Sequence, residues 1–444
     1  MTIGSYRRKI IMFAIPIFIG SLFQQLYNAA DSLIVGRLVG SNALAAVSSV
    51  GNLIFVMIGF FNGMSVGAGV VIARYIGARD REGTQLSVHT AIALGLVSSV
   101  VMTVLGVVFA PACLQAMGTP DVVMPLSVTY LRIYFLGSIG LVMYNTFIGI
   151  LQAAGDSRHP LFYLIVSSVT NVVLDLFFIA VLGYGVGAAA LATSISQILS
   201  AALSLIRLMR IETDYRVSLR KIRFEKSILK KIIRYGVPSG LQNSIIGFSN
   251  VVIQSFINSF GEMAMAGIGA YVKIEGFAFL PVTSFVMTLP TFISQNLGAK
   301  QPERARKGTR FGILICVAVG EIIGIIILIG APFLTALFDP TPEVVAYGVG
   351  RAQAVCIFYF LLAFTHVMSS VMRGYGQTVT PMVIMLVCWC AIRMLIIMVV
   401  GRYVHNIALA YWVYPITWTM SATALLIAYF KKILPGAVLS KESI

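Results

Sequence analysis

Long apolar runs constrain the fold of this chain more than any other feature. A bilayer core of about 30 Å needs about 20 mostly apolar residues per helix. Twelve segments meet this length: 10–34, 43–73, 86–110, 125–152, 161–182, 186–208, 229–258, 264–294, 309–330, 345–372, 381–401 and 407–430. Only 11% of the residues are charged, against about 25% in a soluble domain. The sequence predicts an all-α integral membrane protein with twelve transmembrane helices, and excludes a soluble enzyme and a disordered chain.

The positive charge is unevenly distributed among the loops. The 32 Lys and Arg residues outnumber the 16 Asp and Glu residues, and most lie in alternate loops, above all in 207–234. The opposite loops contain Arg37, Arg351 and Arg402. Because basic residues collect in cytoplasmic loops, we expect a multi-pass protein of the inner (cytoplasmic) membrane with both termini cytoplasmic. Anionic lipid explains the charge, and no nucleic-acid partner is expected.

The chain repeats itself at an interval of 221 or 222 residues. Matching pairs are Pro16 and Pro238, 75–79 and 296–300, 110–111 and 331–332, 119–123 and 341–345, Gly155 and Gly376, and Pro160 and Pro381. Six spans per half give both halves the same orientation, so the repeats are parallel. We expect two six-helix bundles around a central cavity: an N-terminal lobe (1–208), a basic linker (209–228), a C-terminal lobe (229–432) and a cytoplasmic tail (433–444).

Four acidic residues fall within predicted spans: Asp31, Asp175, Glu275 and Glu321. A charge at the centre of a membrane helix costs about 2.5–3.5 kcal/mol on insertion scales, so each needs an explanation. For Glu321 we expect a local structural contact. The other three acids are candidates for function.

The first span carries a polar stripe. Gln24, Tyr27, Asn28 and Asp31 follow the spacing i, i+3, i+4, i+7 and therefore share one helix face. A polar face of this kind is expected to point into the protein rather than toward lipid.

Polar residues on the fifth and sixth spans form a second candidate group. Asn171 and Asp175 are four residues apart and point the same way, and Thr193 on the sixth span could add a hydroxyl oxygen. Carboxylate and neutral oxygens suit a hard cation such as Na+, and the same carboxylates could carry H+. The pattern predicts a coupling site for Na+ or H+ and leaves the choice open.

The second half departs from this pattern. At the repeat interval, Asn171 corresponds to Ile392 or Arg393, and Asp175 to Ile396 or Ile397. Glu275 either pairs with Arg393 or Lys273, or faces the cavity and attracts cationic substrate. The seventh span carries amides and no carboxylate. Candidate residues of the substrate cavity are Gln24, Asn243, Asn250, Gln254, Glu275 and Arg393.

The duplicated motifs resemble the MATE (multidrug and toxic compound extrusion) family, prokaryotic type. They are Pro16 with the stretch 24–31, the loops 77–79 and 298–300, and the loops 155–160 and 376–381. The resemblance implies a cation-coupled antiporter that exports amphipathic, often cationic, compounds by alternating access. It also implies an N-terminal-lobe ion site whose residues map onto Asp31, Asn171, Asp175 and Thr193, with Tyr27 and Asn145 nearby.

Two rival functions remain as alternatives. A lipid-linked oligosaccharide flippase of the same larger group needs a cationic cavity for pyrophosphate. The basic residues expected within the membrane are Arg132, Lys273 and Arg393, and they form no dense cluster. A membrane-embedded enzyme needs converging catalytic groups, for example acids and histidines at metal-ligand spacing, and the sequence shows none. We therefore expect no enzyme, no cofactor and a monomer that contacts small organic substrates and the lipid bilayer.

Overall fold

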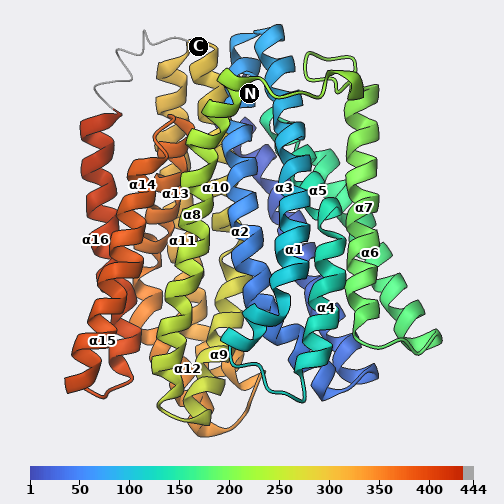
Figure 1. The fold of residues 1–444 in the computed structure, drawn as a ribbon. Helices are drawn as coiled ribbons and strands as arrows, with labels where there is room; N and C mark the ends of the chain where they lie inside the picture. The colour runs from blue at the N-terminus through green and yellow to red at the C-terminus, as the bar shows by residue number, and fades with distance from the viewer. Residues whose placement is uncertain (434–444) are drawn as a thin grey trace. The chain divides into compact units, whose positions relative to one another are not determined.

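The computed structural model describes residues 1–433, apart from the side chains of residues 41, 42, 44, 45, 48, 49, 52, 55, 56, 248 and 251. The described chain is built from helices and their connections, without a β-strand (Figure 1). The predicted all-α membrane fold is therefore confirmed. The predicted cytoplasmic tail lies outside the described residues from position 434 onward.

The helices follow one another with short connections. In chain order they are α1 (Tyr6–Leu38), α2 (Ser41–Ala78), α3 (Arg81–Ala116), α4 (Met124–Leu136), α5 (Ser138–Ala153), α6 (Arg158–Asp175), η1 (Leu176–Val181), α7 (Gly187–Arg210), η2 (Leu219–Lys221), α8 (Lys226–Asn258), α9 (Glu262–Ala278), α10 (Leu280–Gly298), α11 (Pro302–Ala336), α12 (Pro342–Val355), η3 (Cys356–Phe358), α13 (Tyr359–Gly374), α14 (Val379–Met385), η4 (Leu386–Ile392), α15 (Arg393–Tyr403) and α16 (Ala408–Lys432). The segments η1 and η4 are π-helices, whereas η2 and η3 are 3₁₀-helices.

Each of the twelve predicted spans corresponds to a helix or a set of joined helices. Within residues 1–433, nine helices are long and apolar enough to cross a membrane, and two bent pairs raise this number to eleven. The twelfth position is taken by α8, whose 33 residues extend for about 50 Å at 1.5 Å per residue. The length of the apolar runs therefore predicted the helical spans correctly.

The eighth predicted span is bent at one of its two expected kink sites. Helices α9 and α10 meet at Phe279 with an angle of 45°, and Pro281 stands in the first turn of α10. A proline fits there because the first turn needs no backbone donor. Pro290 lies inside α10 without interrupting it, so the kink predicted there is wrong.

A second bend, of 47°, joins α4 to α5 and was not expected from the sequence. It falls at Gly137, where an added Cβ would lie 2.3 Å from the Cβ of Ser194 on α7. The backbone at the bend therefore approaches α7 too closely for any side chain.

The chain forms two compact units whose borders differ from the expected lobes. One unit contains residues 19–240, and the other contains residues 1–18 together with 241–444. Helices α1 and α8 are therefore each divided between units, two residues after Pro16 and Pro238, respectively. The sequence repeat indicated two halves but gave no sign of this exchange of helix ends.

The first part of α8 belongs to the unit of residues 19–240 because of a close glycine contact. Gly63 and Gly67 on α2 meet Gly240 and Gly236 on α8, and an added Cβ at Gly63 would lie 2.1 Å from the backbone nitrogen of Gly240. Both helices thus present a G-x-x-x-G pattern, which allows membrane helices to pack backbone to backbone.

The first residues of the chain belong to the other unit. The Met1 amino group donates a hydrogen bond to Gln295 Oε1 at 2.8 Å, and Arg304 donates to the Met1 carbonyl at 3.2 Å. Ile10 and Ala14 are buried in the core of that unit. Both ends of this segment are therefore fixed by specific contacts.

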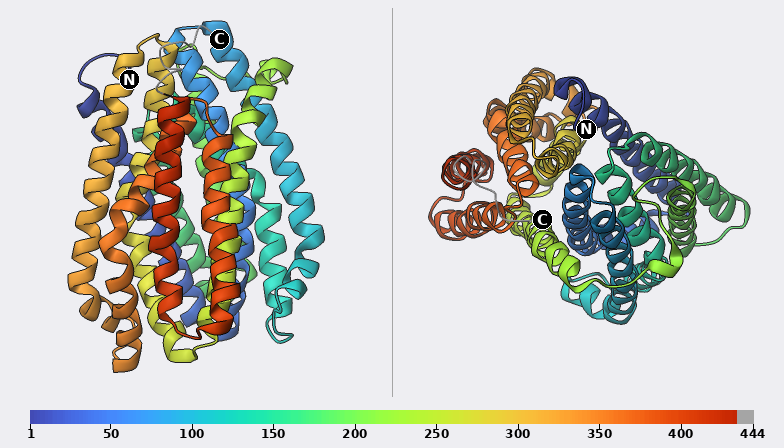
Figure 2. Two further views of the ribbon diagram at one scale, coloured as in Figure 1. Left: turned by 90° about the vertical axis from the view of Figure 1, so that its left-hand side faces the viewer. Right: turned by 90° about the horizontal axis from the view of Figure 1, so that it is seen from above.

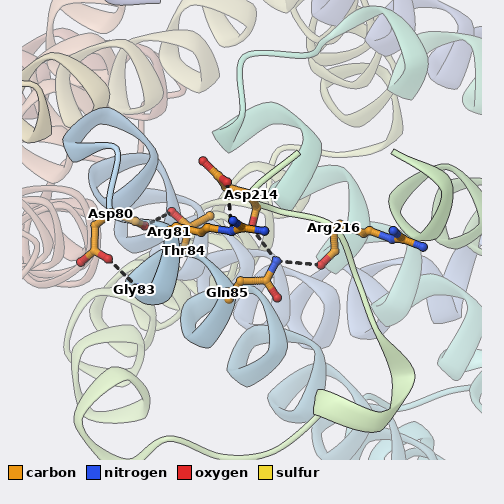
Figure 3. Close-up of polar contacts among 7 residues, drawn as sticks. All are labelled: Asp80, Arg81, Gly83, Thr84, Gln85, Asp214 and Arg216. Atoms are coloured by element: carbon orange, nitrogen blue, oxygen red, sulfur yellow. Dashed lines mark hydrogen bonds and ion pairs between the residues drawn. The ribbon is translucent and has the colours of Figure 1, made fainter. Parts of the chain in front are cut away.

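The predicted basic linker is anchored on α3, as Figure 3 shows. Gln85 donates hydrogen bonds to the carbonyl oxygens of Asp214 and Arg216, at 2.6 and 3.1 Å. Arg81 also forms an ion pair with Asp214 at 3.5 Å. The segment between the repeats is thus held against the unit of residues 19–240.

Candidate functional site

Asp175 is the last residue of α6 and is followed directly by the π-helix η1. Its side chain is 0% exposed. Within the part of the chain that the structure covers, neither carboxylate oxygen has a hydrogen-bond donor. The π-helical turn, a feature often found at functional sites, widens the backbone immediately after this buried acid.

Asn171 lies one turn before Asp175 and connects α6 to α7. Its amide nitrogen donates to Thr193 Oγ1 at 3.3 Å, and Thr193 donates in turn to the carbonyl oxygen of Ala189 at 2.9 Å. The Oδ1 atom of Asn171 is buried and receives no hydrogen bond from a described residue. The three polar residues predicted on the fifth and sixth spans therefore lie together, with oxygen atoms left unpaired.

The first helix brings a second carboxyl group to the same place. The carboxyl groups of Asp31 and Asp175 lie within hydrogen-bonding reach of each other. Asp31 is only 9% exposed, and its Oδ1 lacks a donor among the described side chains. Tyr27 on α1 and Tyr130 on α4 are near enough to both acids to interact electrostatically.

No basic residue neutralises these acids. In residues 1–433 the ion pairs are Arg81 with Asp214 and His159 with Asp156, and both are far along the chain from Asp31 and Asp175. A buried charge without a partner is unstable by several kcal/mol. The site therefore combines two facing carboxyl groups with neutral oxygens and lacks a counter-charge.

The donor set fits a small cation or a proton. No group of three or more His, Cys, Asp or Glu side chains gathers at a metal-like site in the described residues. A bound Na+ would therefore need the neutral oxygens of Asn171 and Thr193 in addition to the two carboxylates, which are hard ligands of the kind Na+ prefers. A proton would need only the two carboxyl groups.

Other residues predicted near this site are less buried. Gln24 and Asn28 are exposed, although Gln24 interacts with Tyr27 one turn away. Asn145 on α5 donates to the Leu141 carbonyl at 2.9 Å and lines a water-sized cavity of about 10 Å³. These positions surround the acids without contributing a charge.

In the other unit, Glu275 lies in a chain of hydrogen bonds. Tyr359 on α13 donates to Glu275 Oε1 at 2.9 Å, and its hydroxyl also bonds that of Tyr271 at 2.6 Å. Neither of the two partners proposed from the sequence, Arg393 and Lys273, forms an ion pair with Glu275. The ion-pair alternative is therefore wrong, and Glu275 instead accepts from a tyrosine.

Arg351 was assigned to an outer loop, and the structure corrects this. It is 3% exposed and lies nine residues into α12, about 14 Å along the helix at 1.5 Å per residue. Its guanidinium group stands 4.5 Å from the ring centre of Tyr414, and that of Arg393 stands 4.4 Å from the same ring. The loop count overlooked Arg351 even though the predicted span 345–372 contains it.

The remaining candidates lie apart from both groups. On α8, Asn250 and Gln254 are exposed and Asn243 is partly buried, and Gln254 donates to Asn258 at 2.9 Å. Glu321 on α11 accepts a hydrogen bond from the backbone nitrogen of Phe360 at 2.9 Å. The local structural contact predicted for Glu321 is thus confirmed.

Comparison with known proteins agrees with these features. The MatE family model matches residues 16–177 and again residues 238–399. The chain belongs to the MatE family. The two matches begin at Pro16 and Pro238, so they also confirm the duplication found in the sequence. The family resemblance predicted from the motifs is confirmed as well.

Relatives and solved structures cover nearly the whole chain. A probable multidrug resistance protein, YoeA of Bacillus subtilis, is 28% identical over 93% of this chain and 91% of its own length. The probable multidrug resistance protein NorM of Thermotoga maritima is 24% identical over 99% and 95%, respectively. A crystal structure of a MATE protein in the straight conformation shares the fold, with a TM-score of 0.89, 24% identity and 96% of each chain covered.

Proposed function

We propose that this MatE-family protein is an antiporter that exports amphipathic organic compounds and is driven by inward movement of Na+ or H+. The observation that carries the proposal is the pair Asp31 and Asp175, two buried carboxyl groups that face each other without a basic partner among the described residues. Acids in this situation within a membrane span are typical of ion and proton pathways.

Binding of one small cation provides a physical basis for coupling. An ion at Asp31 and Asp175 removes the penalty of burying two like charges, and so it favours whichever conformation brings these groups together. Transport then requires that this conformation bind cargo less well than the other, since equal affinity for both states would shift no equilibrium. Alternating access of the site to the two membrane faces completes the cycle.

The cargo class follows from the relatives. Curated relatives are named multidrug resistance or export proteins, among them MepA of Staphylococcus aureus. Exposed polar residues such as Gln24, Asn250 and Gln254 and the abundant aromatic rings suit varied amphipathic molecules. We place the protein in the inner membrane as a monomer, with both termini cytoplasmic because the loops predicted on that side are basic.

The flippase alternative gains one feature and lacks others. Arg351 beside Arg393 doubles the buried positive charge expected for the second unit. However, the relatives cited above are named for drug resistance, and a flippase does not require the facing acids of the first unit. Export of small amphipathic compounds therefore remains the better-supported function, and the two arginines are considered separately below.

Substitution of Asp175 by Asn tests the proposal directly. The purified protein is reconstituted into liposomes, a Na+ or pH gradient is imposed, and transport of a fluorescent organic cation is followed. Asn is isosteric with Asp and cannot carry the negative charge, so gradient-driven transport should fall to background. Asp156→Asn is the matched control, because Asp156 lies just before the same helix α6 and accepts hydrogen bonds from its first residues.

The outcomes separate coupling from folding. The Asp175→Asn protein should elute as a single species and retain the melting temperature of the control within a few degrees. Transport by Asp175→Asn at the rate of the wild type would contradict the assignment of the coupling site. Equal responses of the wild type to a Na+ gradient, a pH gradient and no gradient would contradict antiport itself.

A further inference from the structure

Two arginines lie deep inside the unit of residues 1–18 and 241–444. Arg351 on α12 is 3% exposed and Arg393, the first residue of α15, is 1% exposed. Their guanidinium carbons lie 4.5 and 4.4 Å from the ring centre of Tyr414 on α16. The helices α15 and α16 run side by side in Figures 1 and 2. The structure thus gathers two positive charges around one aromatic ring.

These charges are not matched by carboxylates. Glu275 is near enough to act on both guanidinium groups, but its carboxylate accepts from Tyr359 and forms no ion pair in the described chain. Two guanidinium groups therefore face a single acid. Because an unpaired buried charge is strongly unfavourable, this unit has an unfilled requirement for negative charge.

The hydrogen-bond donors of the two arginines are unequally used. Arg393 donates through Nε and Nη2 to Thr417 Oγ1, at 3.2 and 2.8 Å. Arg351, by contrast, has buried Nε and Nη1 atoms without a partner among residues 1–433. These two nitrogens form one edge of the guanidinium fork, the geometry that binds both oxygens of a carboxylate or phosphate.

Aromatic rings surround the two arginines. Arg351 also lies 5.3 Å from the ring centre of Tyr271, and Arg393 lies 5.1 Å from that of Trp389. Such rings orient guanidinium groups and can also pack against a flat apolar ligand. The surroundings combine a fixed positive end with an aromatic wall.

We propose that Arg351 and Arg393 form a binding site for the oxyanion, a phosphate or carboxylate, of an amphipathic aromatic molecule. Arg351 binds the oxyanion through its free fork, Arg393 adds charge while it is held by Thr417, and Tyr414 lies between the ring of the ligand and the two cations. The site takes anionic cargo, or the anionic end of a zwitterionic cargo. As cargo recognition this inference rests on the transport function proposed above, but binding can be measured without transport.

A pair of flavins isolates the contribution of the oxyanion. Riboflavin 5′-phosphate and riboflavin share one aromatic ring system and differ by a phosphate. Binding of each to the full-length protein in a neutral detergent is measured by fluorescence anisotropy. We expect the phosphate to improve the affinity about tenfold or more, as for a charge-assisted, two-pronged contact.

Substitution of the arginines should remove this preference. Arg351→Met and Arg393→Met keep most of the side-chain volume, and each should reduce the affinity ratio of the two flavins to about threefold or less. Arg351→Lys keeps the charge but loses the fork and should give an intermediate ratio. Arg402→Met is the matched control, since Arg402 lies exposed at the end of the same helix α15 as Arg393.

Glu275 provides a test of opposite sign. Because its carboxylate competes with any anion for the two arginines, Glu275→Gln should tighten binding of the phosphate-bearing flavin. Gln retains an oxygen that can accept from Tyr359. Weaker binding in Glu275→Gln would overturn the proposal, as would equal affinity of the two flavins for the wild type or an unchanged ratio in both arginine-to-methionine variants.

The oxyanion could also come from a membrane lipid, and nanodiscs of defined composition separate the two sources. If soluble cargo fills the site, riboflavin 5′-phosphate binds equally in phosphatidylcholine and phosphatidylglycerol discs. If lipid phosphate fills it, binding weakens in phosphatidylglycerol discs, and this weakening disappears in Arg393→Met. The flavin preference should also survive in Asp175→Asn, so failure of ion coupling and failure of this site give different results.

Discussion

The two units carry opposite charge at positions related by the internal repeat. Asn171 and Asp175 of the first unit correspond, at 222 residues, to Arg393 and Ile397 of the second. Tyr130, which interacts with both acids of the first unit, corresponds at 221 residues to Arg351. Thus acids are replaced by apolar residues, and neutral polar residues are replaced by arginines.

The surrounding scaffold changed less than the charges. The fifth span of each repeat contains a π-helix, η1 in the first unit and η4 in the second. In each unit the residue at position 171 or 393 donates to a threonine on the next span, Thr193 or Thr417. The duplication therefore preserved a helix pair and its threonine contact, while the two sites diverged toward cation and anion.

The largest expected effect tests whether the two acids act as one site. Asp31→Asn and Asp175→Asn should each reduce gradient-driven transport about 100-fold, which corresponds to roughly 3 kcal/mol. Because the carboxyl groups face each other, the double variant should be no worse than either single one. The rates are measured in liposomes under saturating ion gradients. Multiplicative losses would show two independent sites and would break the contrast between the units.

A smaller effect should distinguish the two threonines. Thr193→Val removes a neutral oxygen beside the acids and should raise the ion concentration for half-maximal transport about tenfold, the equivalent of one hydrogen bond. Thr417→Val, the corresponding change in the second unit, should leave the ion dependence unchanged, because no acid lies at positions 396 and 397. The ion dependence of transport is measured for both. Equal shifts would mean that both units bind the coupling ion.

The smallest effect concerns two buried tyrosines. Tyr359→Phe removes hydrogen bonds to Glu275 and Tyr271 and should destabilise the protein by about 1–2 kcal/mol. Tyr144→Phe, in the first unit, removes a buried hydroxyl that has no partner among the described residues and should change stability by less than about 0.5 kcal/mol. Thermal unfolding in detergent compares the two. A larger loss for Tyr144→Phe would reveal a partner of its hydroxyl.

Hydropathy and repeat arguments predicted the helices but not their packing. The twelve spans followed from the length of the apolar runs, because a bilayer imposes that length on any helix. The i, i+4 spacing placed Asn171 and Asp175 on one face. The contact between Asp31 and Asp175, however, depends on how α1 packs near α6, and no local pattern specifies this.

Two other features escaped prediction for different physical reasons. The bend at Gly137 reflects a close approach to Ser194 on another helix, which leaves no trace in local propensity. Arg351 was misassigned because counting charges by loop ignores burial. The repeat interval from the buried Tyr130 was the signal that could have located it.

The division of α1 between the units has a consequence for biosynthesis. Residues 1–18 leave the ribosome before any other part of the chain, yet their core partners lie beyond residue 240. Conversely, the unit of residues 19–240 includes the start of α8, which is made after the linker. A chain cut within 209–225 would leave each fragment without a piece of its own core, so the two halves must mature as one polypeptide or exchange those ends when co-expressed.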